Sequence, residues 1–299
     1  MRARTIKLDE YLKERKSLVD AALEQYLPPA GEAPARVHEA MRYSTLDGGK
    51  RIRPILTLAA CETVGGSVEI AMPTACAIEL IHSFSLVHDD LPCMDNDDFR
   101  RGRPTAHRAF GEAMALLAGD ALFALAFRLI SLTPVEAPAN VVLDVIRLIA
   151  SAAGTRGMVG GQVMDLLAQG RAVELSEVEQ IHRLKTGALL EASAVAGGML
   201  GGGTEAQVGA LSAYGRNVGL AFQIADDILD LRGDAAKLGK PVGSDLKLAK
   251  ATYPSVIGIE RSVELAARAV SDAIDAISGF DERAEPLRLV ARFSVERET

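Results

Sequence analysis

Apolar residues recur along most of the chain with the spacing of an α-helix rather than the alternation of a β-strand. Intervals of three and five residues join the apolar positions in 175–189: Leu175, Val178, Ile181, Leu184 and Leu189. This spacing places them toward one face of a helix. Proline is absent between Pro138 and Pro241, and alternating apolar runs bounded by turn residues are hard to find. The pattern predicts an all-α protein.

Residues that favour turns divide this pattern into helical segments. They gather at five places: 27–34, around Pro73, 132–140, 197–203 and 233–245. None of these stretches is long or polar enough to indicate an interdomain linker. We therefore expect one domain over residues 1–299, folded as a single large helical bundle.

Composition places the chain among folded globular proteins, because 48% of its 299 residues are hydrophobic and 24% are charged. A net charge of −7 argues against a nucleic-acid partner. Asp120 and Arg128 interrupt the most apolar stretch, 113–132, so we expect a buried helix and no stable membrane insertion. Three cysteines without a C-x-x-C pair and a charged N-terminal segment favour a cytoplasmic location.

Two acidic clusters change this picture. The segment 87–102, VHDDLPCMDNDDFRRG, contains five aspartates, and 222–231, FQIADDILDL, contains three. A helix turns about 100° per residue, so Asp226, Asp227 and Asp230 fall within an arc of roughly 100° and can reach one ligand. Each cluster alone is also compatible with a solvated surface.

The first cluster needs a break in its helix, because Asp95 lies five residues after Asp90 and would point roughly 140° away from it on a regular helix. Pro92 disfavours helical geometry at the preceding residue. We expect the helix to end or bulge there, so that Asp95 turns back toward Asp90. Two carboxylate trios without an excess of histidine or cysteine favour Mg²⁺, which usually shares its coordination with phosphate oxygens.

Basic residues suited to phosphate lie near these clusters. GGKRIRP at 48–54 places Lys50 and Arg53 three residues apart, and Arg100 and Arg101 follow the first acidic cluster directly. Guanidinium groups match phosphate oxygens in geometry and charge, so these residues favour diphosphate binding over simple neutralisation of the acids.

At this point the sequence resembles the trans-isoprenyl diphosphate synthases, specifically the short-chain bacterial farnesyl and geranylgeranyl diphosphate synthase group. The matching stretches occur in the family's order over about residues 48–254: GGKRIRP, HSFSLVHDDLPCMDNDDFRRGRPTAH, AGDALF, GGQVMDL, KTGALLEAS, FQIADDILD and LGK…AKATYP. The resemblance implies an all-helical fold around a deep central cavity, with the two aspartate motifs facing each other, and usually a homodimer.

The resemblance also implies roles for individual residues. The ligands of two or three Mg²⁺ ions would be Asp89, Asp90, Asp95, Asp226, Asp227 and Asp230. An allylic diphosphate would lie near Arg100, Lys185, Thr186, Gln223 and Lys240. Isopentenyl diphosphate would lie near Lys50, Arg53, His82 and Arg101. The reaction is then carried chiefly by Asp89, Asp90, Asp95, Arg100, Lys185, Asp226 and Lys240.

The implied reaction condenses isopentenyl diphosphate with dimethylallyl or geranyl diphosphate. Phe84 lies five residues before Asp89 and resembles the aromatic residue that blocks longer products in farnesyl-forming relatives, which favours farnesyl diphosphate as the product. Ser85 lies more directly beneath Asp89 and is small, which leaves geranylgeranyl diphosphate as the alternative. Two other readings are a metal-dependent phosphohydrolase, from the His88-Asp89 pair, and an inactive partner subunit.

Overall fold

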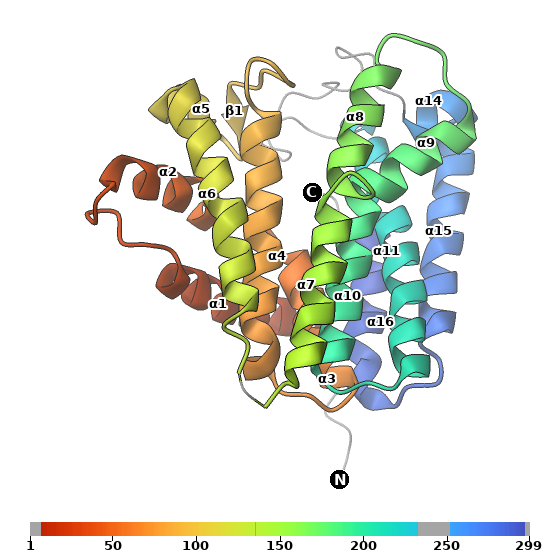
Figure 1. Ribbon diagram of the computed structural model, residues 1–299. Coiled ribbons are helices and arrows are strands. Elements are labelled where there is room, and N and C mark those ends of the chain that lie inside the picture. The colour runs from red at the N-terminus through yellow and green to blue at the C-terminus, as the bar shows by residue number, and fades with distance from the viewer. Residues whose placement is uncertain (1–6, 135, 233–251, 297–299) are drawn as a thin grey trace.

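The computed structural model describes residues 7–134, 136–232 and 252–296, which form helices and one short hairpin (Figure 1). The helices are α1 (Leu8–Tyr26), α2 (Ala35–Leu46), α3 (Ile52–Thr63), α4 (Val68–Asp89), α5 (Ala106–Phe110), α6 (Glu112–Ile130), α7 (Ala139–Ala153), α8 (Met158–Ala168), α9 (Leu175–His182), the π-helical η1 (Arg183–Gly187), α10 (Ala188–Leu200), α11 (Glu205–Arg232), α14 (Tyr253–Ile257), α15 (Ile259–Ala276), the 3₁₀ turn η2 (Glu282–Ala284) and α16 (Glu285–Glu296). Two antiparallel strands, β1 (Phe99–Arg100) and β2 (Arg103–Pro104), complete the described part. The predicted all-α class is confirmed.

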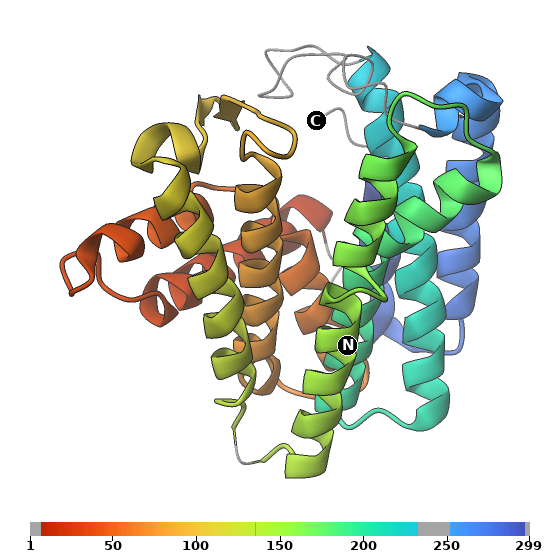
Figure 2. The same ribbon diagram turned by 45° about the horizontal axis from the view of Figure 1, so that its top comes forward.

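The long helices lie in two groups that meet along α3 and α10. One group contains α4 and α6, and the other contains α11 and α15, with α10 packed against both α11 and α3. Figures 1 and 2 show the orange α4 and yellow-green α6 on one side and the cyan α11 and blue α15 on the other. This arrangement leaves the C-terminal ends of α4 and α11, which carry the two acidic motifs, at the same end of the bundle.

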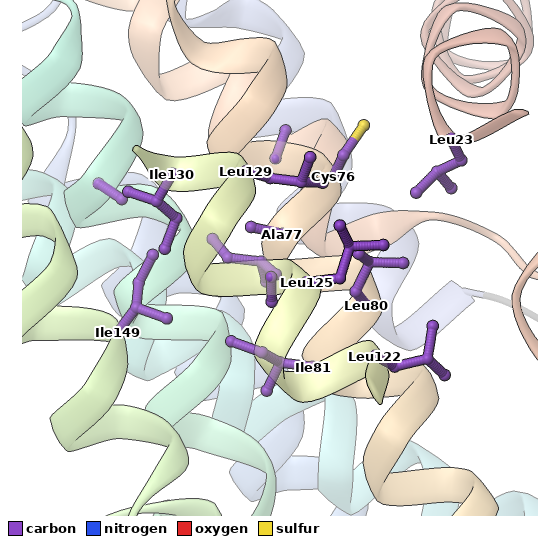
Figure 3. Close-up of a cluster of buried hydrophobic side chains, with 14 of the residues drawn as sticks. Leu23, Cys76, Ala77, Leu80, Ile81, Leu122, Leu125, Leu129, Ile130 and Ile149 are labelled. Atoms are coloured by element: carbon purple, nitrogen blue, oxygen red, sulfur yellow. The ribbon is translucent and has the colours of Figure 1, made fainter. Parts of the chain in front are cut away.

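Helix α4 is apolar around most of its circumference because it runs through the interior of the bundle. Ala77, Leu80 and Ile81 are fully buried and pack with Leu122 of α6 in the largest hydrophobic cluster (Figure 3). By length and composition alone, α4 and α6 could each cross a membrane, and 67% and 44% of their apolar windows are buried inside the bundle. Burial therefore accounts for more of the apolar surface of α4 than of α6.

Helix ends lie within or beside the predicted turn segments 27–34, 132–140 and 197–203, whereas 233–245 lies outside the described residues. The break expected around Pro73 is wrong, since α4 continues through this proline from Val68 to Asp89. Pro73 is the sixth residue of α4, where a proline removes one backbone hydrogen bond and crowds the carbonyl oxygen of Glu69. The buried neighbours of Pro73, including Ala71 and Ala75, hold the helix together at that point.

The close contact between α10 and α3 depends on Gly197. A Cβ atom at this position would lie 2.1 Å from the carbonyl oxygen of Thr57, a backbone atom that cannot move unless α3 moves. We expect Gly197→Ala to lower the free energy of unfolding by about 1–3 kcal/mol, as overpacking typically does. Thermal and denaturant unfolding measure this change.

Gly209 of α11 provides the matched control, because a Cβ atom there meets nothing within 4 Å. We expect Gly209→Ala to leave stability unchanged or to raise it by up to about 1 kcal/mol, since alanine favours helix more than glycine does. Equal unfolding midpoints for the two variants would contradict the tight α10–α3 contact.

Candidate active site

The first aspartate motif begins where α4 ends. Asp89 is the last residue of the helix, and its carbonyl oxygen accepts a hydrogen bond of 2.8 Å from the backbone N–H of Asp95. The chain therefore turns back after Pro92, as predicted from the sequence. This turn brings Asp95 beside Asp89 instead of leaving it on the opposite side of a continuing helix.

A hairpin directly after this motif positions two arginines. Arg101 and Gly102 connect β1 to β2 with φ angles of 53° and 76°, the left-handed pair that a tight two-residue turn requires. Arg100 donates three hydrogen bonds of 2.6–2.9 Å to the carboxylate of Asp90. Arg101 donates to the carbonyl oxygen of Gly48 at 3.0 Å, which joins the hairpin to the GGKRIRP loop.

The second aspartate motif lies on one regular helix, α11, as its spacing predicts. Thr186 of η1 donates to the Gln223 amide oxygen at 2.7 Å, and the Gln223 amide nitrogen donates to Asp227 at 2.9 Å. The other oxygen of Asp227 accepts the backbone N–H of Tyr253 at 2.9 Å. Asp227 and Asp230 are buried, whereas Asp226 is partly exposed.

A π-helical segment carries Lys185 and Thr186. Its extra residue per turn interrupts the regular helix between α9 and α10, a distortion that often occurs at functional sites. Lys185 donates to the carboxylate of Asp165 on α8 at 2.6 Å. Gly161 permits this approach, because a Cβ atom there would lie 2.2 Å from the backbone nitrogen of Lys185.

A cavity of about 660 Å³ joins these elements. Its wall includes Leu86 of α4, Thr186 of η1 and Phe222 of α11. Eight predicted site residues line it: Lys50, Arg53, His82, Arg100, Arg101, Thr186, Gln223 and Asp226. The structure thus brings together residues from the basic loop, the first motif's hairpin and the second motif.

Four arginines act on His82, which lies in the wall of the cavity. Burial lowers the pKa of His82 well below its usual value, and the guanidinium groups of Arg53, Arg101, Arg100 and Arg51 lower it further. Burial also lowers the pKa of Arg53, against the attraction of Glu79 and Asp226. The buried Nε of Arg53 has no hydrogen-bond partner among the described residues. An anion in this cavity would meet a neutral imidazole and several charged guanidinium groups.

His182 is a buried neutral side chain beside the second motif. Burial lowers its pKa to about 4. Its Nδ1 lies 3.8 Å from a carboxylate oxygen of Asp227, so at neutral pH this contact is not a salt bridge. The imidazole packs against the ring of Tyr253 with a centroid distance of 5.2 Å, which makes it part of the wall that holds Asp227.

The remaining predicted residues do not line this cavity, and one of them lies outside the described residues. Asp89, Asp90 and Asp95 stand at the end of α4, Lys185, Asp227 and Asp230 belong to η1 and α11, and Lys240 lies outside the described residues. Phe84 packs against His88 and against Phe123 of α6, with ring centroids 4.7 and 5.0 Å apart. Ser85 is partly buried and donates to the carbonyl oxygen of His82.

Sequence reasoning missed three charged residues that support the site: Arg51, Glu79 and Asp165. Arg51 and Glu79 form a buried ion pair of 2.7 Å, and both line the cavity. A single glutamate within the apolar run ACAIELI was an available signal, because a buried carboxylate needs a partner. Asp165 lies in GGQVMDL, one of the stretches that carry the family resemblance.

The helical fold and the charged cavity define an all-α protein with a site suited to diphosphates. A family model described as polyprenyl synthetase matches residues 34–285. The chain therefore belongs to the polyprenyl synthetase family, and it is a prenyltransferase of isoprenoid biosynthesis. Family members act on isopentenyl diphosphate and allylic diphosphates.

Individual relatives cover nearly the whole chain. A protein from Cyanophora paradoxa named geranylgeranyl diphosphate synthase is 48% identical over 288 residues, which cover 96% of this chain and 95% of the relative. An apo crystal structure of an FPP/GFPP synthase from Zymomonas mobilis is similar with a TM-score of 0.86, 40% identity and coverage of 96% and 98%. A geranylgeranyl pyrophosphate synthetase from Pyrococcus horikoshii Ot3 has a TM-score of 0.89, 37% identity and coverage of 97% and 98%.

The lowered pKa of His82 predicts a dependence of stability on pH. The folded chain keeps this imidazole neutral, whereas the unfolded chain takes up a proton below about pH 6.5. The protein therefore loses stability as the pH falls below this value, by up to about 1.4 kcal/mol per pH unit for one proton. Denaturant unfolding at pH 7.0 and 5.5 should show a smaller loss for His82→Gln than for the unmodified protein.

The control for this measurement is His38→Gln, on α2 and outside the cavity. It should keep the pH dependence of the unmodified protein. An identical pH dependence for His82→Gln and the unmodified protein would contradict the assignment of His82 as a buried neutral group.

Proposed function

We propose that this prenyltransferase is a Mg²⁺-dependent short-chain prenyl diphosphate synthase whose main product is geranylgeranyl diphosphate. The observation that carries this proposal is the cavity itself. It is lined by Arg53, Arg100 and Arg101 and by Gln223 and Asp226 of the second aspartate motif. Two diphosphate groups need this combination of cations and metal-binding carboxylates within one site.

The donor set fits Mg²⁺. Its carboxylate oxygens are hard ligands, and Asp89, Asp95 and Asp226 are partly exposed at the end of the bundle. Within the described ranges, no three histidine, cysteine or acidic side chains converge as a complete metal cage. Mg²⁺ commonly takes only one or two carboxylates from the protein and the rest of its ligands from water and phosphate, so a complete cage is not required.

Each side of the cavity has a distinct part in the reaction. The carbon–oxygen bond of the allylic diphosphate breaks, and the double bond of isopentenyl diphosphate attacks the resulting cation to form a carbon–carbon bond. A proton then leaves the product for the released diphosphate. Arg100 and Lys185 stabilise the charge that develops on the leaving diphosphate. Bound Mg²⁺ would supply further positive charge to the same group.

Polar side chains in the cavity wall would stabilise the allylic carbocation. The Thr186 hydroxyl and the Gln223 amide are held by their mutual hydrogen bond, which fixes two oxygen dipoles in the cavity wall. The apolar interior behind them, including Leu86 and Phe222, limits access of water to a reactive cation. Isopentenyl diphosphate would use Lys50, Arg53 and Arg101, which also line the cavity.

The names of the relatives and the position of Phe84 support a C20 product over the farnesyl product favoured from sequence. The relatives from Cyanophora and Pyrococcus are both named for geranylgeranyl diphosphate. On α4 the cavity is lined by Glu79, His82 and Leu86, whereas the ring of Phe84 packs toward α6. Farnesyl diphosphate remains the second candidate, because Phe84 still stands five residues before Asp89.

A product assay tests this proposal. The purified protein is incubated with Mg²⁺, isopentenyl diphosphate and each of dimethylallyl, geranyl and farnesyl diphosphate, and chain length is measured by mass spectrometry. We expect C20 diphosphate from all three starters and loss of turnover with EDTA. Asp226→Asn should reduce kcat by 100-fold or more, because it removes a charge from the metal-binding side.

Three results would count against the proposal. Accumulation of C15 with no conversion of farnesyl diphosphate would favour the second candidate, and Phe84→Ala should then lengthen the product. Release of phosphate without a prenyl product would support a phosphohydrolase. A folded chain without turnover on any starter would support an inactive partner subunit.

We also propose that the protein is a homodimer that uses the outer faces of α6 and α7. Leu116 and Leu117 of α6 are 46% and 52% exposed, and Leu143 of α7 is 46% exposed. Leu116 and Leu117 lie near the start of α6 and Leu143 near the start of α7, so these side chains are spread along the two helices. Exposed large apolar side chains on neighbouring helices commonly mark an interface between subunits. The lower burial of α6 within the bundle supports the same face.

Sedimentation measurements test this interface. We expect the unmodified protein to sediment as a dimer and Leu117→Asp to sediment as a monomer, because a carboxylate would be buried without a partner. Leu18→Asp on α1 is the matched control, since Leu18 is 41% exposed on a different face and should leave the dimer intact. A monomeric unmodified protein would contradict this proposal.

We propose a reducing compartment such as the cytoplasm for the protein. Cys61 and Cys76 are buried free thiols, and Cys93 is an exposed free thiol within the first motif. Such thiols persist where disulfides do not form.

A further inference from the structure

We propose that a buried charge network of Arg51, Glu79 and Asp20 positions the binding site for isopentenyl diphosphate. These three residues are positioning residues, and they act through Lys50 and Arg53. The inference rests on the proposed function, because it concerns the second substrate of that reaction. Arg51, Glu79 and Asp20 are not among the residues proposed to bind Mg²⁺ or the allylic diphosphate.

Each guanidinium nitrogen of Arg51 donates a hydrogen bond to a different helix. Its Nε donates to Asp20 of α1 at 2.8 Å, its Nη1 donates to Glu79 of α4 at 2.7 Å, and its Nη2 donates to the carbonyl oxygen of Thr45 in α2 at 2.7 Å. The residue is 2% exposed. A single side chain therefore fixes three helices relative to the start of α3.

The backbone of Arg51 adopts a strained conformation, which often occurs at functional sites. Arg51 has a φ angle of 54° and a ψ angle of 34°, the left-handed region that non-glycine residues rarely adopt. The conformation persists because the three contacts of the side chain oppose its relaxation. It also sets the direction in which the chain enters α3.

The two residues that would bind isopentenyl diphosphate stand on either side of this fixed point. Lys50 precedes Arg51 and is exposed, Arg53 follows within the first turn of α3, and both line the cavity. Arg101 reaches the same loop through the carbonyl oxygen of Gly48. Rotation of the backbone at Arg51 would therefore change the distance between the two cations that bind one diphosphate.

Glu79 makes the inference testable, because two possible roles predict opposite results. Its carboxylate is 3% exposed, lines the cavity and attracts Arg53 and Arg101 as well as Arg51. If Glu79 acted only as a nearby negative charge, its removal would strengthen binding of an anionic substrate. If it holds Arg51 in place, its removal weakens binding, because the cations lose their alignment.

The experiment compares Glu79→Gln with Glu62→Gln. Glu62 of α3 accepts a 2.6 Å hydrogen bond from Arg15 of α1, so this variant also loses one carboxylate that joins α3 to the rest of the bundle, but outside the cavity. We expect Glu79→Gln to raise the KM for isopentenyl diphosphate by 10-fold or more and to change the KM for the allylic diphosphate by less than 2-fold. Glu62→Gln should leave both values unchanged.

Asp20→Asn provides a second variant at the outer end of the network. Asp20 does not line the cavity, and its contact with the network is the hydrogen bond from Arg51. We expect a 2- to 5-fold higher KM for isopentenyl diphosphate and an unchanged allylic KM. This variant also decides the matter if Glu79→Gln does not fold.

Steady-state kinetics at saturating allylic diphosphate, with circular dichroism as a check of folding, measure these effects. An unchanged or lower KM for isopentenyl diphosphate in both folded variants, or equal changes in the two substrates' KM values, would overturn the inference. Failure of the unmodified protein to form any prenyl product would instead overturn the proposed function.

Discussion

Positive charge gathered in a partly buried pocket is the constraint on which the rest of the site depends. The pKa of His82 lies well below its usual value, chiefly because of burial and further because of the guanidinium groups of Arg53, Arg101, Arg100 and Arg51. Guanidinium groups this close repel one another and lose hydration when buried, so each needs a compensating partner. The acidic residues, the GGKRIRP loop and the β1–β2 hairpin lie where they can supply these partners.

The arginines differ in how far the protein itself satisfies their hydrogen-bond donors. Glu79 and Asp20 neutralise Arg51, and Asp90 accepts three hydrogen bonds from Arg100. The Nε of Arg53 is buried without a hydrogen-bond partner in the described part of the chain. A diphosphate would supply the missing acceptor at Arg53, whereas Arg51 already has all of its acceptors from the protein.

The sequence predicted most accurately where a single helix or a local turn decides the geometry. Asp226, Asp227 and Asp230 share one side of α11 because the helix is regular, and Asp95 returns to Asp89 because Pro92 stops α4. The all-helical fold followed from apolar spacing in the same way. The break expected at Pro73 did not occur, because tertiary burial of α4 compensates for one lost hydrogen bond.

Hydrogen-bond partners that are distant in the sequence could not be predicted from the spacing of residues along the chain. Arg51 meets Glu79 across 28 residues, Lys185 meets Asp165 across 20, and Tyr253 meets Asp227 across 26. Each pairing depends on how whole helices pack, which a one-dimensional pattern does not specify. Product length is difficult to predict from sequence for the same reason. It depends on the side of α4 toward which the ring of Phe84 packs.

The most direct measurement is a crystal structure of the protein with Mn²⁺, isopentenyl diphosphate and an unreactive thio-analogue of an allylic diphosphate. Anomalous scattering from manganese should place the metal between the end of α4 and α11, in contact with the allylic diphosphate. The diphosphate of isopentenyl diphosphate should lie against Lys50 and Arg53. Manganese or either diphosphate bound outside this cavity would contradict the assignment of the charged pocket as the site of prenyl transfer.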